Sequence, residues 1–144
     1  MNIVSQILES KGYQVWTINR EATVLDGIRL MADKKIGSLL IIENENPVGI
    51  FTERDYARKV AFTNKKPEEL RIDEVMTKEL ITVSPVQSVR DCMRLMTENQ
   101  IRHLPVLDDG KVIGIVSIGD VVKDLIEELE FLVEQLKGYI TGLQ

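Results

Sequence analysis

Two short motifs in this chain place a hydroxyl and a carboxylate three residues apart, directly after an apolar segment. Both fit Gly-h-x-Ser/Thr-x-x-Asp, where h is apolar, and they cover residues 49–55 and 114–120. If a strand ends at the hydroxyl and a helix begins there, the N–H groups of the first helical turn favour a phosphate. The carboxylates of Asp55 and Asp120 can accept hydrogen bonds from two vicinal hydroxyls, such as those of a ribose. The glycine of each motif, Gly49 or Gly114, would keep the approach clear of side chains. Each motif therefore predicts a site for a phosphate and a sugar.

The same residues also have a purely structural interpretation. The spacing from 52 to 55 and from 117 to 120 matches the capping box, in which two polar side chains satisfy the first N–H groups of a helix. The chain repeats this spacing, without the preceding glycine, at 23–26 and 88–91. The motifs taken singly therefore predict either a ligand site or ordinary helix caps.

The two motifs belong to an internal repeat with an offset of 65 residues. The same offset maps Thr17 onto Thr82 and Ile36 onto Ile101, and no gap is needed between Thr17 and Asp55. A repeat of this length indicates one structural unit used twice, and two such units usually pack about an approximate two-fold axis. Because clefts between such halves are natural ligand sites, the repeat bears on function as well as on fold.

Each half has the hydrophobic pattern of a β-α-β-β-α unit, which predicts an α/β fold made of two such repeats with pseudo-two-fold symmetry. The elements expected in the first half are strands over 15–18, 38–42 and 48–52, and helices that begin at Thr23 and Thr52. The elements expected in the second half are a short strand at Thr82-Val83, a helix capped by Ser88, and strands over 104–107 and 112–117. A hairpin turn is expected at 108–111, where Gly110 tolerates a positive φ.

The C-terminus departs from the repeat. From Gly119 onward an apolar stripe predicts a long amphipathic helix. Its apolar positions are Val122, Leu125, Ile126, Leu129, Leu132, Val133, Leu136 and Ile140. A core of two repeats does not easily cover so long a stripe, so the helix packs either on another chain or, folded back, on its own core.

Composition argues against several classes of function. The formal net charge of −5 argues against nucleic-acid binding over a broad basic face. The only histidine and cysteine, His103 and Cys92, cannot build a metal centre of several such ligands, and no nucleophile is paired with His103. We therefore expect no catalysis and no metal. No apolar run has membrane-spanning length, and a lone cysteine fits a reducing cytoplasm.

The joint order of these features resembles a tandem pair of cystathionine β-synthase (CBS) domains, called a Bateman module. The resemblance covers about residues 15–126 and rests on the doubled motif, on 101–106 before the hairpin and on 112–117 after it. The segments 51–59 and 73–77 look like those of small bacterial proteins that consist of little besides such a pair. The resemblance also rests on the β-α-β-β-α order expected for each half.

The resemblance implies an adenosine-containing ligand: AMP, ADP, ATP, NAD(H) or S-adenosylmethionine. In that family the matching aspartate typically holds the ribose, the matching hydroxyl contacts ribose or phosphate, and backbone near the first strand frames the adenine. The ligand-binding residues expected on this basis are Thr17, Ile18, Thr52, Arg54, Asp55, Arg58, Lys59, Thr82, Val83, Arg102, His103, Pro105, Ser117 and Asp120.

The two expected sites differ in charge. Arg54, Arg58 and Lys59 lie in the helix that follows the first motif, whereas Ile118 and Gly119 begin the helix after the second. These three cations either contact phosphates or form a solvated helix face.

The resemblance implies a homodimeric cytoplasmic sensor of adenine nucleotides that has no catalysis and binds its ligand in the cleft between the repeats. The alternative is a structural module for dimerisation or partner docking, with degenerate ligand sites. We expect the N-terminal helix and first repeat over 1–62, a linker over 63–78, the second repeat over 79–126 and a helical extension over 127–144. The sequence does not choose among the ligands and does not identify a downstream protein partner.

Overall fold

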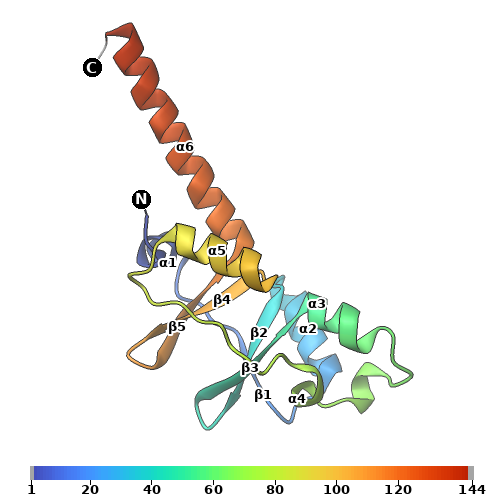
Figure 1. Cartoon of the computed structure of the whole chain (residues 1–144). Helices are drawn as coiled ribbons and strands as arrows, with labels where there is room; N and C mark the ends of the chain where they lie inside the picture. The colour runs from blue at the N-terminus through green and yellow to red at the C-terminus, as the bar shows by residue number, and fades with distance from the viewer. Residues whose placement is uncertain (1, 143–144) are drawn as a thin grey trace. The chain divides into compact units, whose positions relative to one another are not determined.

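The computed structural model describes residues 2–142 (Figure 1). The contacts divide the chain into two compact units, each of which contains one repeat. The first-repeat unit comprises residues 14–81, and the second-repeat unit comprises residues 2–13 together with 82–142. The predicted α/β fold, with two repeats and a long C-terminal helix, is confirmed.

The first-repeat unit contains a three-stranded sheet in the order β1-β2-β3. Strand β1 (Thr17–Asn19) runs parallel to β2 (Ser38–Glu43), and helix α2 (Val24–Lys34) connects them. Strand β3 (Asn46–Thr52) returns antiparallel to β2. The helix cap predicted at Thr23 is present, since the Thr23 side chain accepts a hydrogen bond from the backbone N–H of Asp26.

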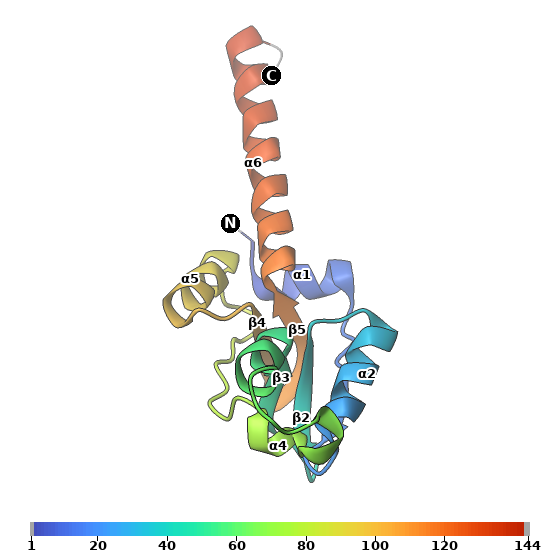
Figure 2. The same cartoon turned by 90° about the vertical axis from the view of Figure 1, so that its right-hand side faces the viewer.

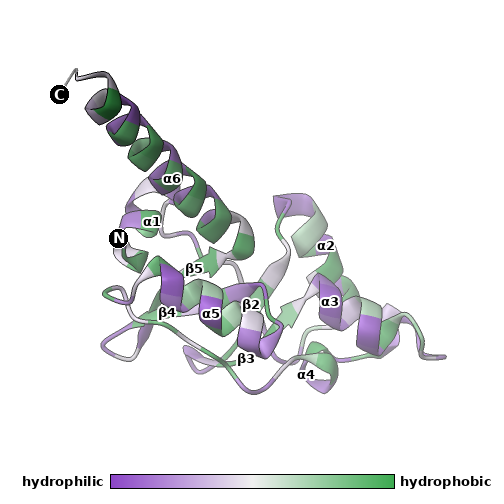
Figure 3. Cartoon of the chain, turned by 45° about the horizontal axis from the view of Figure 1, so that its top comes forward, coloured by the Kyte–Doolittle hydropathy of each residue, from purple (hydrophilic) through white to green (hydrophobic). Residues whose placement is uncertain are grey.

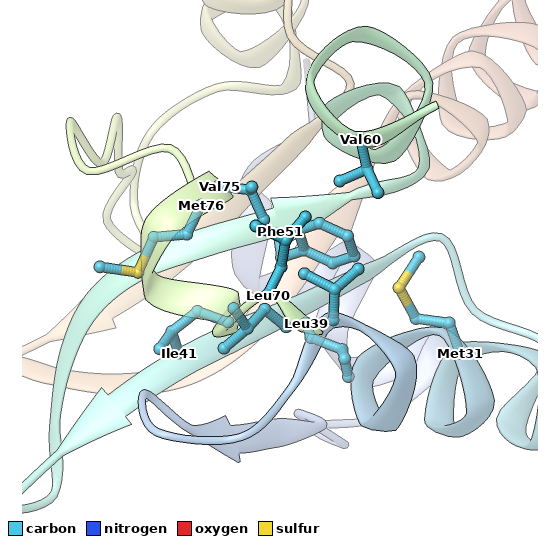
Figure 4. Close-up of a cluster of buried hydrophobic side chains, with 10 residues drawn as sticks. Met31, Leu39, Ile41, Phe51, Val60, Leu70, Val75 and Met76 are labelled. Carbon is cyan, nitrogen blue, oxygen red and sulfur yellow. The ribbon is translucent and has the colours of Figure 1, made fainter. Parts of the chain in front are cut away.

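Four short helical segments complete this unit. Helix α3 (Glu53–Asp55) continues as a π-helical segment over Tyr56–Val60, and a 3₁₀ turn (Pro67–Glu69) precedes α4 (Ile72–Val75). Figure 4 shows the buried side chains that these segments and the sheet bring together. The buried cluster consists of Val24, Met31, Leu39, Ile41, Phe51, Val60, Leu70, Ile72, Val75 and Met76.

The second-repeat unit takes its elements from both ends of the chain. Helix α1 (Val4–Lys11) packs on β5 (Lys111–Ser117) and on the start of α6 (Ile118–Thr141). Strand β4 (His103–Asp108) pairs antiparallel with β5, and α5 (Val89–Asn99) packs against both β4 and α6. The cap predicted at Ser88 is present at the start of α5.

Both hairpins close with the same two-residue turn. Asn44 and Glu45 have φ values of 50° and 67°, and Asp109 and Gly110 have values of 52° and 77°. Two successive residues with positive φ are typical of the type I′ turn, whose twist matches that of the flanking strands. Each hairpin also has a register shift at the equivalent place, at 41/42 and at 106/107. The predicted hairpins are therefore confirmed as copies of one geometry.

The expected first strand of the second repeat is reduced to a single bridge between Val83 and Val106. In the first repeat, the backbone N–H of Leu40 donates to the carbonyl of Trp16 (3.1 Å). The equivalent of Leu40 is Pro105, which has no N–H to donate. The strand predicted at Thr82-Val83 is therefore shorter than its counterpart in the first repeat.

The compact units follow different boundaries from those expected from the repeat. Helix α1 packs with the second repeat, whereas the sequence-based prediction places it with the first. The segment 63–78, expected as a linker, belongs to the first-repeat unit and supplies buried Leu70 and Ile72. The backbone N–H of Val24 donates to the Leu70 carbonyl (2.9 Å), which fixes this segment against the start of α2.

Helix α6 is a single helix of 24 residues. It is well packed at its start, where Val121 is fully buried, and then runs past α1 and α5 of the same unit (Figure 2). Figure 3 shows apolar residues along its length. Its exposed large apolar side chains are Val122, Ile126, Leu129, Phe131, Leu132, Val133, Leu136, Tyr139 and Ile140. Residues 2–142 therefore do not cover the stripe, contrary to the alternative in which it folds back on its own core.

Candidate functional site

The second motif lies where β5 ends and α6 begins. The Ser117 Oγ accepts a hydrogen bond from the backbone N–H of Asp120 (3.2 Å), and Asp120 Oδ2 accepts one from the backbone N–H of Ser117 (2.8 Å). This reciprocal pair is a capping box, so the structural interpretation of the motif is confirmed here. The Asp120 side chain is 21% exposed, which leaves it within reach of a ligand.

Lys11, from the end of α1, contacts the same carboxylate. Its Nζ lies 2.7 Å from Asp120 Oδ2 and also donates to the carbonyl of Ile115 (2.9 Å). Burial acts to raise the pKa of the Asp120 carboxyl, but the hydrogen bonds from Lys11 and Ser117 outweigh it, so the pKa lies below its ordinary value. Lys11 was not among the predicted site residues, because it lies outside the repeat.

The glycine of the second motif serves packing. A Cβ on Gly114 would lie 2.7 Å from Leu8 Cδ2, so only glycine lets α1 approach β5 this closely. The expectation that Gly114 keeps an approach clear for a ligand is therefore wrong, because Leu8 occupies that space. Because α1 lies so close to β5, Lys11, one helical turn after Leu8, reaches the start of α6.

Two other predicted residues lie beside the second motif. His103 is the cross-strand partner of Ser117 in the β4–β5 pair. The backbone N–H of Ile118 donates to the carbonyl of Arg102 (2.8 Å), which fixes the first turn of α6 to the start of β4. Pro105 is buried in β4. The fold thus brings Arg102, His103, Ser117 and Asp120 together.

The first motif has a more enclosed carboxylate. Asp55 is 8% exposed, and its Oδ2 accepts hydrogen bonds from the backbone N–H (3.0 Å) and the hydroxyl (3.2 Å) of Thr52. Its Oδ1 accepts a hydrogen bond from the Thr77 hydroxyl (2.9 Å) and lies 3.0 Å from Lys59 Nζ. The Thr52 hydroxyl in turn accepts from the backbone N–H of Asp55 (3.2 Å), which confirms a second capping box. Both oxygens of Asp55 are therefore engaged within its own unit.

A methionine lies over the glycine of the first motif. A Cβ on Gly49 would lie 2.5 Å from Met76 Sδ and 3.0 Å from the carbonyl oxygen of Thr77. The backbones of Ile50 and Thr77 also exchange two hydrogen bonds, of 2.9 and 2.8 Å. The expectation of an open approach at Gly49 is therefore wrong as well.

The two carboxylates obtain their cations from different positions in the repeat. Lys59 follows Asp55 by one helical turn, and the equivalent position after Asp120 is Asp124. The Oδ1 of Asp124 accepts a hydrogen bond from Asn2 Nδ2 (2.9 Å). Lys11 replaces the missing cation, so the charge pairing is kept although the residue that supplies it differs.

The other predicted residues are spread over both units. Arg54 is partly buried in α3, and Arg58 is exposed in the π-helical segment. Lys59 Nζ also donates to the carbonyl of Val75 (3.1 Å), so its charge already has partners. Ile18 pairs with Ile41 in the sheet, next to the exposed Thr17.

Residues 82 and 83 occupy the corresponding place in the second repeat. The Val83 N–H donates to the Pro105 carbonyl (3.0 Å), and the Val83 carbonyl accepts from Leu107 (2.9 Å). Both polar backbone groups of Val83 are therefore used by β4, whereas Thr82 is partly buried.

The first-repeat unit has a pocket of about 530 Å³ that none of the predicted site residues lines. Its walls are mainly apolar and come from α2, the loop between α2 and β2, β3, α3 and the start of the π-helical segment. The lining residues are Ile28, Met31, Ala32, Lys35, Ile36, Gly37, Phe51, Glu53 and Tyr56. No pattern in the sequence predicts this pocket, because its lining residues look like ordinary core and helix-surface residues.

Residues 2–142 contain no group of three or more His, Cys, Asp or Glu side chains placed to bind a metal ion. In the same part of the chain, no helix is long and apolar enough to span a membrane. The lone Cys92 is fully buried in α5.

The CBS domain model matches this chain twice, over residues 4–61 and 72–127. The chain therefore belongs to the CBS-domain family and carries a tandem pair of these domains. It is 37% identical to the mitochondrial CBS domain-containing protein CBSX3 of Arabidopsis thaliana, over 96% of this chain and 72% of that protein. The crystal structure of the CBS domain NE2398 is similar at 44% identity, with a TM-score of 0.84, over 87% of this chain and 98% of that one.

Two further solved structures bear on ligands and assembly. The CBS domain pair of protein MJ0100, in complex with 5′-methylthioadenosine and S-adenosyl-L-methionine, is 25% identical with a TM-score of 0.77. The match covers 89% of this chain and 98% of that one. A hexameric CBS-CP12 protein from bloom-forming cyanobacteria is 32% identical with a TM-score of 0.76, over 84% of this chain and 66% of that one. Relatives of this chain thus bind adenosyl ligands and form oligomers.

Proposed function

We propose that this protein is a non-catalytic regulatory module that binds an adenosine-containing ligand, such as AMP, ATP, NAD(H) or S-adenosylmethionine. Membership of the CBS-domain family and the adenosyl ligands of the related pair support this proposal. Regulation requires the ligand to bind two arrangements of the module with different affinities. That the ligand lies between the two repeats stays a prediction.

The observation that carries the proposal is the partly exposed Asp120 carboxylate at the start of α6. Its neighbours are the Ser117 hydroxyl and the Lys11 ammonium, 2.7 Å from Asp120 Oδ2. Two vicinal hydroxyls of a ribose would donate to this carboxylate, and a phosphate would meet the Lys11 charge. We assign Asp120 the ribose and Lys11 a phosphate-facing role.

The two motifs would then have unequal roles. Both oxygens of Asp55 are engaged by Thr52, Thr77 and Lys59, so a ribose there would have to displace existing partners. Asp120 is more exposed and offers easier access. We propose that the second motif is the principal ligand contact, with Arg54 and Arg58 as further candidates for phosphate.

Mutation of Asp120 tests the assignment. Purified protein would first be denatured, and any released small molecule identified by absorbance at 260 nm and mass spectrometry. Calorimetry with AMP, ATP, NADH and S-adenosylmethionine would then compare the wild type with Asp120→Ala. Loss of charge-assisted hydrogen bonds to ribose should weaken binding by roughly 1.5–3 kcal/mol, or about 10- to 150-fold.

Glu127→Ala is the matched control, because it removes an exposed carboxylate from the same helix. It should bind the ligand as the wild type does. Equal affinity in the wild type, Asp120→Ala and Asp55→Ala would contradict the ribose assignment.

A second candidate function is dimerisation or partner docking without a ligand, favoured by the exposed apolar stripe of α6. An empty protein whose melting temperature does not rise with any of the four ligands would support it. A homodimer is proposed in either case, in line with the oligomers of relatives. The cytoplasmic location stays a prediction, since the plant relative is named as mitochondrial, and cell fractionation would test it.

A further inference from the structure

The exposed side of α6 carries apolar residues with a heptad repeat. From Val122 onward the spacing alternates between four and three residues, through Ile126, Leu129, Val133, Leu136 and Ile140. This alternation averages 3.5 residues, the period that keeps one face of two supercoiled helices in continuous contact. All six side chains are exposed.

The residue types at these positions indicate two helices in parallel. In this register the a positions are Ile126, Val133 and Ile140, and the d positions are Val122, Leu129 and Leu136. Branched Ile and Val at a, with Leu at d, favour a parallel two-stranded coiled coil. The fit is imperfect only at the first d position, where valine replaces leucine.

Charges beside these six positions favour the same orientation. The e positions are Lys123, Glu130 and Lys137, and in a parallel pair they face apolar g positions rather than like charges. An antiparallel pair that matched all six core positions would place Lys123 beside the partner's Lys137. It would also place each Glu130 beside its own copy, and like charges at such short range are unfavourable.

The stripe has the area of an ordinary dimer interface. The stripe and the adjoining Tyr139 together offer eight exposed large apolar side chains, whereas Phe131 lies on the opposite side of the helix. If each removes on the order of 100 Å² from water, together they bury about 800 Å² per chain, which is what a stable dimer needs.

We propose that α6 pairs in parallel with α6 of a second copy of this chain, as a two-stranded coiled coil. The inference rests on the homodimer of the proposed function and names the surface that forms it. It places the two copies of Leu136 directly opposite each other.

Analytical ultracentrifugation of the full chain tests the interface. The wild type should sediment as a dimer, and Leu129→Glu with Leu136→Glu should weaken association at least 100-fold. Phe131→Glu is the control, because it places a glutamate at an exposed apolar position off the stripe, and it should remain dimeric. Ile140→Glu, at a side chain that is 80% exposed, serves as a milder variant whose fold is checked by circular dichroism.

The outcomes separate the inference from the proposed function. A dimer that survives the double substitution would overturn the α6 interface and leave the homodimer intact. A monomeric wild type would overturn both, whereas a trimer or tetramer would overturn the two-stranded assignment. Adenosyl-ligand binding is measured on the same variants and does not depend on any of these results.

A disulfide tests the orientation. In a parallel pair, Leu136→Cys should form an intermolecular disulfide under mild oxidation, because facing d positions lie within the distance that a disulfide spans. Cys92 does not interfere, since it is fully buried. Efficient cross-linking is expected, and a dimer that fails to cross-link at this position would contradict the parallel arrangement.

Discussion

Lys11 Nζ lies 2.7 Å from Asp120 Oδ2, although 109 residues separate the two in the chain. Asp55 has a comparable contact with Thr77, whose hydroxyl donates to Asp55 Oδ1 (2.9 Å). Lys11 precedes the first repeat but contacts the second, and Thr77 precedes the second repeat but contacts the first. Each carboxylate is therefore held by the segment that leads into the other repeat.

Lys11→Met should make the protein less stable at neutral pH. Methionine keeps an unbranched side chain of similar length and removes the ammonium, so the change is sterically reasonable. The partly exposed ion pair should contribute about 0.5–1 kcal/mol to the free energy of unfolding. Because the pKa of Asp120 is lowered in the folded state, this contribution is present above about pH 4 and is lost as the pH falls further.

Urea unfolding of wild type and Lys11→Met at pH 7 and pH 3 measures this difference. The difference should shrink at the lower pH. Lys65→Met is the control, since Lys65 is exposed and lies outside α6, and it should change stability little at either pH. A constant difference across the range would show that Lys11 acts through packing rather than through charge.

Asp55→Ala should destabilise the ligand-free protein more than Asp120→Ala. Asp55 is buried and bonded through both oxygens, so its loss should cost about 2–3 kcal/mol. Asp120 is more exposed, and its loss should cost about 1 kcal/mol, as for other helix caps. Denaturant titration without ligand compares the free energies of unfolding of the two variants. Equal losses of stability would contradict the greater burial of Asp55.

Gly114→Ala should be destabilising because of Leu8. The added methyl group would lie 2.7 Å from Leu8 Cδ2, and overpacking of this kind costs about 1–3 kcal/mol. In a Leu8→Ala background the same change should cost less, with a coupling of at least about 0.5 kcal/mol. The four proteins of this double-mutant cycle would be compared by urea unfolding, and additive effects would argue against the close packing of α1 on β5.

The Cys92 thiol should be unreactive in the folded protein. Its burial, helped by the charge of Asp91, raises the pKa of the thiol to about 11. At pH 8 only about one thiol in a thousand is then ionised, and the reagent has no access. Labelling with a thiol reagent should therefore be slow until urea unfolds the chain, and rapid labelling of the native protein would contradict this environment.

Local features of this fold could be predicted from the sequence. The hydroxyls of Thr23, Thr52, Ser88 and Ser117 all cap helices as expected, because a cap depends on residues only three positions apart. The hairpins and the order of elements were predictable for the same reason. The shortened strand at Val83 could also have been predicted, since Pro105 lies where a backbone N–H donor is needed.

The remaining features depend on contacts between distant residues. Nothing near Lys11 indicates that it binds the carboxylate of Asp120, and nothing near Leu8 indicates that it packs on Gly114. The engagement of Asp55 by Thr77 likewise depends on how 63–78 folds against β3. A single sequence carries no direct signal for such distant pairs. The motif itself was therefore predictable, but the residues that contact its carboxylates and glycines were not.

The second-repeat unit is discontinuous, since residues 2–13 are separated from residues 82–142 by the whole of the first-repeat unit. During synthesis, residues 14–81 leave the ribosome as a complete unit, whereas α1 precedes that unit and packs on β5, which follows it. Until β5 is made, Leu8 lacks the strand at Gly114 on which it packs, and closing so long a loop is slow. A helix that precedes the whole first-repeat unit is therefore among the last to reach its native contacts, and nascent chains that stop before β5 expose its apolar side to chaperones and proteases.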